Sequence, residues 1–381
     1  MSKQCGSRRP SLVVLALLTQ YLISERGRSE DQVANKVEYY TEDGNRIDVL
    51  TESAYFDKAI NSTLSVQGSF VYDSISGASP TGAPPPAGSN KVPTADMDDT
   101  RYAGDLKLGI HLANHTLAPQ FSYSTEHDYT SLGLAFNDAI EFNQKNTTLN
   151  IGISHDFDQV EPTFFPNAKH KDSSEALIGV TQLLNPQTYV TVNGTIGYSE
   201  GYLADPYKRF RFTGYPDPTS TFPEKRPEHK FKQVLYAGAT HFFDPANASL
   251  ETSYRFYHDS FDIYAHTLGL TWYQKLGKHV IIAPFFRYYY QSAADFYHVQ
   301  LPGDPSDPAN PTPIPAYYSA DYRLSELQTF TFGSKVIFQI NDHIRIDAEY
   351  ARYDMEGMNG RTSQDAYPKA NVFSIGGTWS F

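Results

Sequence analysis

Between its turn-forming stretches the chain alternates apolar and polar residues with a period of two. Isoleucine, alanine and tyrosine alternate with arginine, aspartate and glutamate over residues 344–350, and residues 106–112, 149–154 and 250–256 repeat this pattern. Successive side chains of a β-strand point to opposite faces, so each segment predicts a strand with one apolar and one polar face. Most of these segments run for 10–13 residues. Strands of soluble proteins average about 5–6 residues, whereas membrane-spanning strands need about 9–11.

Short and long connections alternate along the chain. The short ones lie at Lys58–Asn61, Ala113–His115, Asn143–Asn146, Asn185-Pro186, Asp244–Asn247, Gly277-Lys278 and Asn341-Asp342. The long or irregular ones lie at 74–100, 158–172, 199–230, 291–320 and 354–370, with tighter exceptions near Asp128 and Ser260. Short periplasmic turns and long extracellular loops are typical of an outer-membrane barrel, and a β-sandwich has no reason to sort its loops in this way.

The strand count follows from these turns. Asp43-Gly44 predicts a hairpin between a short first strand, Val37 to Thr41, and a second strand from Arg46 to Asp57. Continuing to Phe381 gives about 16 strands, with 14 as the fallback, both even as single-chain barrels require. Within residues 46–60 the apolar positions also fit a helical stripe, so a helix is the alternative there. The predicted fold is therefore an all-β, antiparallel, up-and-down transmembrane barrel in the bacterial outer membrane.

The last predicted strand ends on an aromatic residue. Phe373, Ile375, Trp379 and Phe381 alternate with small or polar residues. This pattern resembles the C-terminal signal that the barrel-assembly machinery recognises in bacterial outer-membrane proteins. The sequence therefore predicts that machinery as a partner, together with outer-membrane lipid.

Composition adds an export prediction. Tyrosine (28) and phenylalanine (24) are abundant, which favours strands. The longest apolar stretch, Ser11 to Ile23, follows three basic residues and is too short for a spanning helix. Residues 1–29 are therefore predicted to be a signal peptide and residues 30–381 the barrel, although no small-x-small cleavage triplet follows the apolar stretch. A disordered basic tail is the alternative. The single cysteine, Cys5, lies inside the predicted signal.

Charge excludes one class of partner. The full chain has 31 basic and 43 acidic side chains, and removing the five basic and one acidic residue of 1–29 leaves 26 and 42, a net charge of −16. Such a chain repels nucleic acid, so no nucleic-acid partner is expected.

Several segments resemble one family of bacterial outer-membrane proteins, domain of unknown function 3570. The segments are 42–49, 74–85, 199–208, 254–259, 287–297 and 319–325. The resemblance covers most of residues 36–381 and implies an exported outer-membrane barrel, without implying an activity. Genes of this family stand beside genes for a flavin transferase and thioredoxin-like proteins, which implies a periplasmic redox partner as a candidate.

No catalytic motif is present. The sequence contains no G-x-S-x-G, H-E-x-x-H or G-x-x-x-x-G-K-[ST] pattern. His258, Asp259 and His266 are close in sequence, but their spacing does not predict one convergent metal site. The prediction is therefore no enzyme, no catalytic residues, no cofactor and no metal.

The polar faces of the strands predict a charged lumen. The residues expected to line it are Arg46, Asp48, Glu52, Asp105, Lys107, His111, Glu126, Glu251, Arg255, Arg287, Lys335, Arg345, Asp347 and Glu349. Charges of both signs can either pair into a plug or line a water-filled pore, and a 16-stranded barrel is wide enough for an aqueous channel.

The long loops carry two further predictions. Asp295, Asp321 and Arg323 are expected to tie the loop 291–320 to the barrel rim, with a binding mouth as the alternative. Six tyrosines are expected in the aromatic girdle at head-group level. They are Tyr288, Tyr289, Tyr290, Tyr317, Tyr318 and Tyr322.

Three functions remain open on the sequence. The leading hypothesis is a porin-like channel or export conduit. The second is a non-enzymatic scaffold or sleeve for an envelope redox complex. The third is an outer-membrane hydrolase, which would need a Ser-His-Asx cluster on the outer face of the barrel.

Overall fold

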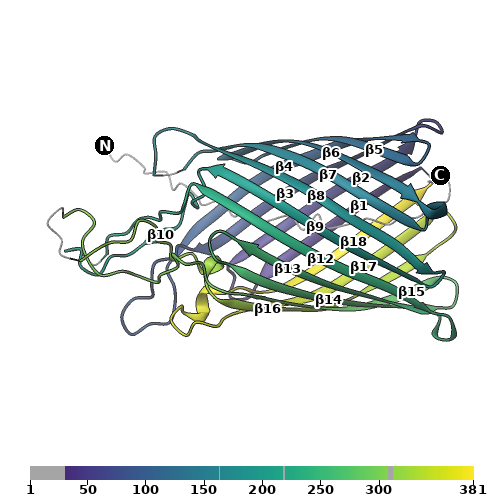
Figure 1. Cartoon of the computed structure of the whole chain (residues 1–381). Helices are drawn as coiled ribbons and strands as arrows, with labels where there is room; N and C mark the ends of the chain where they lie inside the picture. The colour runs from purple at the N-terminus through teal and green to yellow at the C-terminus, as the bar shows by residue number, and fades with distance from the viewer. Residues whose placement is uncertain (1–30, 163, 218, 308–311) are drawn as a thin grey trace, which may run out of the picture.

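Sixteen long strands close into one barrel in the computed structural model (Figure 1). The structure describes residues 31–381 except residues 163, 218 and 308–311. The barrel strands are β1 (Gln32–Glu42), β2 (Ile47–Ala59), β3 (Leu64–Pro80), β4 (Thr94–Leu112), β5 (His115–Thr125), β6 (Tyr129–Phe142), β7 (Thr147–Val160), β8 (Lys169–Asn185), β9 (Thr188–Gly201), β12 (His229–Phe243), β13 (Ala248–Asp259), β14 (Tyr264–Leu276), β15 (Val280–Gln291), β16 (Leu327–Gln339), β17 (Ile344–Gly357) and β18 (Lys369–Ser380). The predicted number of strands is confirmed.

Every barrel strand pairs antiparallel with its neighbours along the chain. Between β9 and β12 the chain leaves the barrel and forms a small second sheet of β10 (Arg209–Phe210) and β11 (Phe222–Pro223). The first and last strands pair from Gln32 opposite Ser380 to Glu42 opposite Ala370. Closure gives every strand a partner on both sides, so the backbone hydrogen-bonding groups of the wall are satisfied within lipid.

The connections are sorted between the two ends of the barrel. Seven short turns lie at one end, which we call the turn end and which also carries the C-terminus (Figure 1). The connections at the opposite end, the loop end, include 81–93, 202–228 and 292–326. This is the predicted outer-membrane layout.

The outer wall of the barrel is apolar. Ile153, Ile178 and Ile375 are 61%, 59% and 59% exposed although they lie in the middle of long strands. A contiguous band of exposed apolar side chains of this size is unfavourable in water and favourable against lipid. Among the described residues there is no helix long and apolar enough to cross a membrane. The protein is an integral outer-membrane β-barrel.

One local prediction at the N-terminal side is corrected and one is confirmed. The first strand is not short, because Gln32–Glu42 is paired over its whole length with β2 and β18. Its outward face includes the polar Asn35 and its inward face the aromatic Tyr40, which interrupt the alternation. Residues 47–59 are a strand and not a helix. The predicted signal peptide lies outside the described residues.

Candidate functional site: the capped lumen

Loops at the loop end contact one another and form a cap over the barrel mouth. The loops of the cap span residues 81–93, 161–168, 202–228, 292–326 and 358–368. The Arg209 N–H donates to the Thr81 carbonyl at 2.8 Å, and the Arg209 guanidinium lies 4.1 Å from the centre of the Phe164 ring. The Thr213 N–H donates to the Leu301 carbonyl at 2.9 Å. Loops that are far apart in the sequence therefore form one body.

The cap reaches into the barrel. Tyr322, on the short 3₁₀ helix η3 (Tyr322–Leu324), is 6% exposed and packs with Tyr289 of β15 and Met355 of β17, which face the lumen. Tyr367 of the loop 358–368 packs in the same cluster. The cap therefore narrows the lumen at the loop end.

A network of ion pairs holds the cap together, and we call it the latch. Its residues are Asp205, Lys208, Glu224, Arg226, Asp321 and Arg323. Arg226 Nε is 2.7 Å from Glu224, and Arg226 Nη2 is 2.8 Å from Asp321. Arg323 Nε donates to Asp321 Oδ1 at 2.9 Å, and its Nη2 binds Asp205. The latch joins loop 202–228 to loop 292–326, whereas the sequence predicts that Asp321 and Arg323 tie loop 291–320 to the barrel rim.

Burial and neighbouring charges shift the pKa values of several latch residues. Burial alone would raise the pKa of Asp321, but Arg323, Lys208 and Arg226 hold it well below its usual range. Burial raises the pKa of Glu224 although Arg226 opposes the shift. Burial lowers the pKa of Lys208, whose Nζ donates to the Pro80 carbonyl at 2.5 Å. The charges of the latch are favourable only while all of its partners stay in place.

Most of the predicted lumen residues lie on the inward face. The side chains that alternate with exposed apolar residues, and so point inward, are Asp105, Lys107 and His111 on β4, Glu251 and Arg255 on β13, Arg287 on β15, Lys335 on β16, and Arg345, Asp347 and Glu349 on β17. Lys335 Nζ lies 3.2 Å from Glu349 and 3.6 Å from Asp347, so some of these charges pair along the wall.

The structure corrects the placement of Asp48 and Glu52. Both alternate with the inward Val49 and Thr51 and share the outward face with Leu50, which is 37% exposed. Apolar residues occupy both phases of β2, so the alternation does not fix which face is polar.

The two remaining predicted residues lie at the rim. Arg46 is in the turn before β2, where its Nε is 3.1 Å from Glu42 and its Nη1 donates to the Asp365 carbonyl at 2.7 Å. Glu126 is in the turn between β5 and β6, with Arg101 Nε 3.8 Å away.

Three of the six tyrosines predicted for the aromatic girdle lie elsewhere, and His258, Asp259 and His266 do not form one site. Of the six girdle tyrosines, Tyr289 faces inward, and Tyr318 and Tyr322 pack inside the cap. His258 and His266 alternate with the inward Asp259 and Thr267, so the histidines and Asp259 lie on opposite faces.

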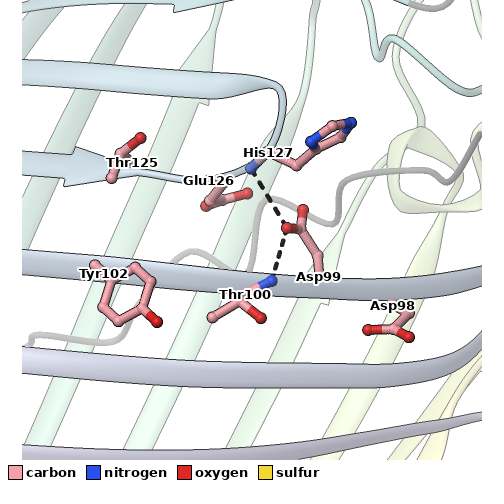
Figure 2. A pocket seen from close by; sticks show the side chains of 7 residues that line it. All are labelled: Asp98, Asp99, Thr100, Tyr102, Thr125, Glu126 and His127. Carbon is pink, nitrogen blue, oxygen red and sulfur yellow. Dashed lines mark hydrogen bonds between the residues drawn. The ribbon is translucent and has the colours of Figure 1, made fainter.

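The turn between β5 and β6 leaves a low notch in the rim. Beyond Thr125, strand β4 continues without β5 as a neighbour, because their pairing begins at Tyr102. A cavity of about 430 Å³ lies at this notch, with walls from β4 and from the turn (Figure 2). Asp99 accepts a backbone hydrogen bond from Thr100 at 2.7 Å and one from His127 at 3.4 Å. The notch is therefore open and acidic.

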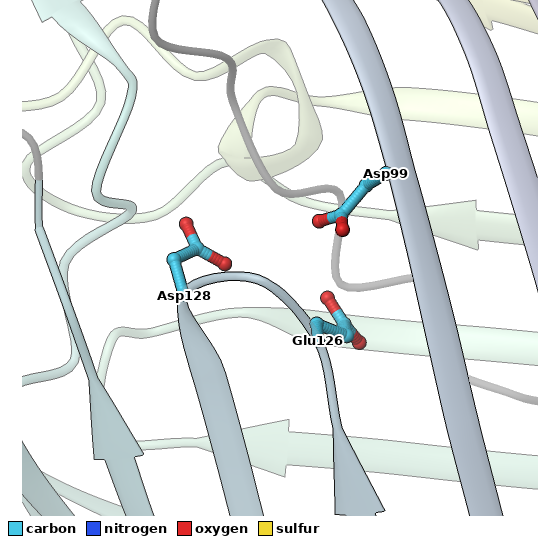
Figure 3. Close-up of side chains that lie close together, drawn as sticks. All are labelled: Asp99, Glu126 and Asp128. Atoms are coloured by element: carbon cyan, nitrogen blue, oxygen red, sulfur yellow. The ribbon is translucent and has the colours of Figure 1, made fainter.

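Three carboxylates face one another at the notch. Asp99 of β4 points toward Glu126 and Asp128 of the turn (Figure 3), and one oxygen of each lies within 4.8 Å of the others. Burial raises the pKa of Glu126 to about 7, with the charge of Asp99 adding to the shift and that of Arg101 opposing it. Oxygen ligands of this kind suit a hard cation such as Ca²⁺. The sequence-based prediction did not include this group, because Asp99 is distant in sequence from the turn that holds Glu126 and Asp128.

His155 of β7 lies close to Asp172 and Ser174 of β8 on the outer face. His155 Nδ1 is 2.8 Å from Ser174 Oγ, and its Nε2 is 3.8 Å from Asp172. The second distance is beyond hydrogen-bonding range, so the aligned acid–base relay of a serine hydrolase is not assembled here.

Comparisons with known proteins agree with the fold. A family model described as a protein of unknown function (DUF3570) matches residues 12–374. CdiB from Acinetobacter baumannii is similar in structure with a TM-score of 0.50 at 7% identity, over 92% of this chain and 60% of that one. At this identity the similarity shows the fold alone.

Two further solved structures are less similar. The siderophore receptor PirA from Pseudomonas aeruginosa has a TM-score of 0.45 at 11% identity over 93% of this chain, which spans 62% of that receptor. Outer-membrane expressed OmpT of Vibrio cholerae has a TM-score of 0.45 at 10% identity, over 92% of this chain and 96% of that one. No curated protein sequence matches the chain.

Proposed function

The chain belongs to the DUF3570 family, and we propose that it is a porin-like channel for small polar solutes whose outer mouth is narrowed by the loop cap. The observation that carries the proposal is the exposure of charged residues on the inner wall. Glu251 and Arg255 of β13 and Arg345 of β17 point inward and are nevertheless exposed. A barrel filled with side chains buries its inward residues, so this exposure supports a water-filled lumen.

The composition of the inner wall supports the same proposal. On β7 the inward positions from 148 to 154 hold threonine, asparagine, glycine and serine. On β9 the inward positions from 191 to 199 hold threonine, asparagine, glycine and serine again. Side chains this small cannot fill the interior of a 16-stranded barrel, and their polar atoms suit contact with water.

Single-channel recording tests the proposal directly. The refolded barrel is inserted into a planar bilayer, and folding is checked by its heat-modifiable migration on a gel. We expect steady openings whose conductance rises with salt concentration. Barrel that is folded by the gel criterion and gives no conductance above that of the denatured chain would overturn the channel proposal.

The interlocked cap favours one second candidate. A rigid outer body of joined loops suits a scaffold or sleeve that holds an envelope redox complex, without solute passing through the lumen. Co-purification of a haem- or thiol-containing protein with a non-conducting barrel would support the scaffold. An openly conducting barrel that purifies alone would exclude it.

A further inference from the structure

Two arginines on the inner wall have no carboxylate partner. Arg255 on β13 and Arg287 on β15 both point into the lumen. Among the described residues neither forms an ion pair, and the contact of Arg255 is with the Tyr257 ring at 5.9 Å. Most other inward cations pair along the wall, as Lys335 does with Asp347 and Glu349. An uncompensated guanidinium pair is therefore a special feature of this part of the wall.

Asp259, four residues after Arg255 on the same strand, already accepts hydrogen bonds from other groups. Asp259 of β13 accepts hydrogen bonds from the Tyr257 hydroxyl at 2.5 Å and from the Phe261 and Ile263 N–H groups at 3.0 and 3.2 Å. These bonds orient Asp259, and between the described side chains of Asp259 and Arg255 the structure shows no ion pair. The two arginines therefore keep their donors for something else.

The strand register places the two arginines on either side of small residues of β14. Thr267 of β14 is paired with both Arg255 and Tyr289, and Gly269 of β14 is paired with Arg287. The two arginines are on strands separated by β14 alone and are offset by two residues along the strand, so their Cα atoms are about 12 Å apart. Thr267 and Gly269 between them are small, and the atom beside the Cβ position of Gly269 is Ser253 Oγ, so no bulky side chain of β14 separates the two arginines.

Tyrosines complete the surroundings. Tyr289 follows two residues after Arg287 on the same inward face, and Tyr353 lies across Thr331 from Arg287. Both tyrosines interact electrostatically with Arg287, and Arg255 and Arg287 repel one another. Tyr322 of the cap packs on Tyr289, so this part of the wall lies directly under the cap.

We propose that Arg255 and Arg287, with the hydroxyl of Tyr353, form a binding site for the carboxylate or phosphate group of an anionic solute in the lumen. A guanidinium presents two parallel N–H donors that match the oxygens of either group, and an anion between the arginines removes their mutual repulsion. The Tyr353 hydroxyl can donate a further hydrogen bond, whereas the Tyr289 hydroxyl already donates to Gln291 Oε1 at 2.7 Å. The inference deepens the proposed channel function by naming the class of solute, and it rests on that function for the solute's route.

Calorimetric titration of the refolded barrel in detergent at low salt tests the site without requiring transport. Citrate serves as the carboxylate probe and pyrophosphate as the phosphate probe. We expect at least one to bind, and Arg255→Gln and Arg287→Gln each to weaken its binding about ten- to 100-fold, the range for hydrogen bonds to a charged group. Arg255→Lys keeps the charge and loses the paired donors, so its binding should lie between wild type and Arg255→Gln.

Arg345→Gln is the matched control. Arg345 is an exposed, inward arginine near the turn end, whose Nη2 donates to Thr378 Oγ1 at 3.4 Å. We expect its substitution to leave binding unchanged. Failure of the wild-type barrel to bind either probe, or an equal loss in Arg345→Gln, would overturn the proposal. Binding by a barrel that does not conduct would support the site and overturn the channel, whereas conduction without binding would do the reverse.

Discussion

The latch makes a sharp prediction for Asp321→Asn. Asp321 is 1% exposed and accepts hydrogen bonds from Arg226 and Arg323, which join the two largest loops of the cap. The substitution keeps the shape of the side chain and removes its charge, leaving the two arginines with Glu224 and Asp205. The cap should therefore open more often, while the strands of the barrel stay paired.

The magnitude follows from the burial of the pair. Removing one partner of a buried ion pair costs about 3–5 kcal/mol, which corresponds to an increase of about 100- to 3,000-fold in the open population of the cap. No discount for solvent screening applies, since Asp321 is inaccessible to water. The barrel is held by its closed ladder of strands and should keep its heat-modifiable migration.

Trypsin measures the opening of the cap. Its sites include Arg211 and Lys225 in loop 202–228, and cleavage there requires the loop to leave the cap. We expect Asp321→Asn to be cut in this loop at least 100-fold faster than wild type. Asp304→Asn is the matched control, because Asp304 is half-buried in the other loop and binds Ser306 two residues later. Equal cutting rates in Asp321→Asn and wild type would refute the role of the latch.

Three further predictions test other features. The raised pKa of Glu126 means that the folded barrel binds this proton more tightly than the unfolded chain, so its contribution is present below about pH 4.5 and is lost as the pH rises through about 7. The melting temperature should fall less over this interval in Glu126→Gln, and an unchanged slope would contradict the assignment. Glu52→Leu should raise the free energy of unfolding by about 1 kcal/mol in a urea titration in lipid, because Glu52 faces outward, whereas Glu251→Leu on the inner wall should show no such gain. Phe381→Ala should lower the amount of assembled barrel in cells while refolding in detergent persists, and equal amounts in cells would argue against a recognition role.

The fold was predictable because the membrane imposes one periodicity on every strand. The alternation along 344–350 and the short turns such as Asn341-Asp342 reflect lipid on one face and water on the other, and both are local in sequence. The prediction failed in β2, where Ile47 and Val49 pack inward with Met97 while Leu50 faces outward. Apolar residues on both faces remove the contrast from which a face is inferred.

The site was only partly predictable, because its parts meet through pairings distant in sequence. A role for Asp321 and Arg323 in tying a loop was visible beside the proline-rich segment, but Glu224 and Asp205 belong to another loop and no local pattern connects them. Likewise Tyr289 and Tyr322 look like girdle residues until the register and the cap place them inside. The acidic notch depends on β4 extending past the end of β5, which a sequence pattern does not show.

The pairing of β1 with β18 has a consequence for biogenesis. The first strand to leave the ribosome and the translocation channel finds its final partner only when the last strand has followed it, because Gln32 is opposite Ser380. A chain lacking residues 369–381 would leave both β1 and β17 with an open edge, which is prone to pair with other chains. Contacts this distant in sequence form slowly, so we expect closure of the barrel to be the last step of its assembly. Until then the edges of the first and last strands remain open to pairing with other chains.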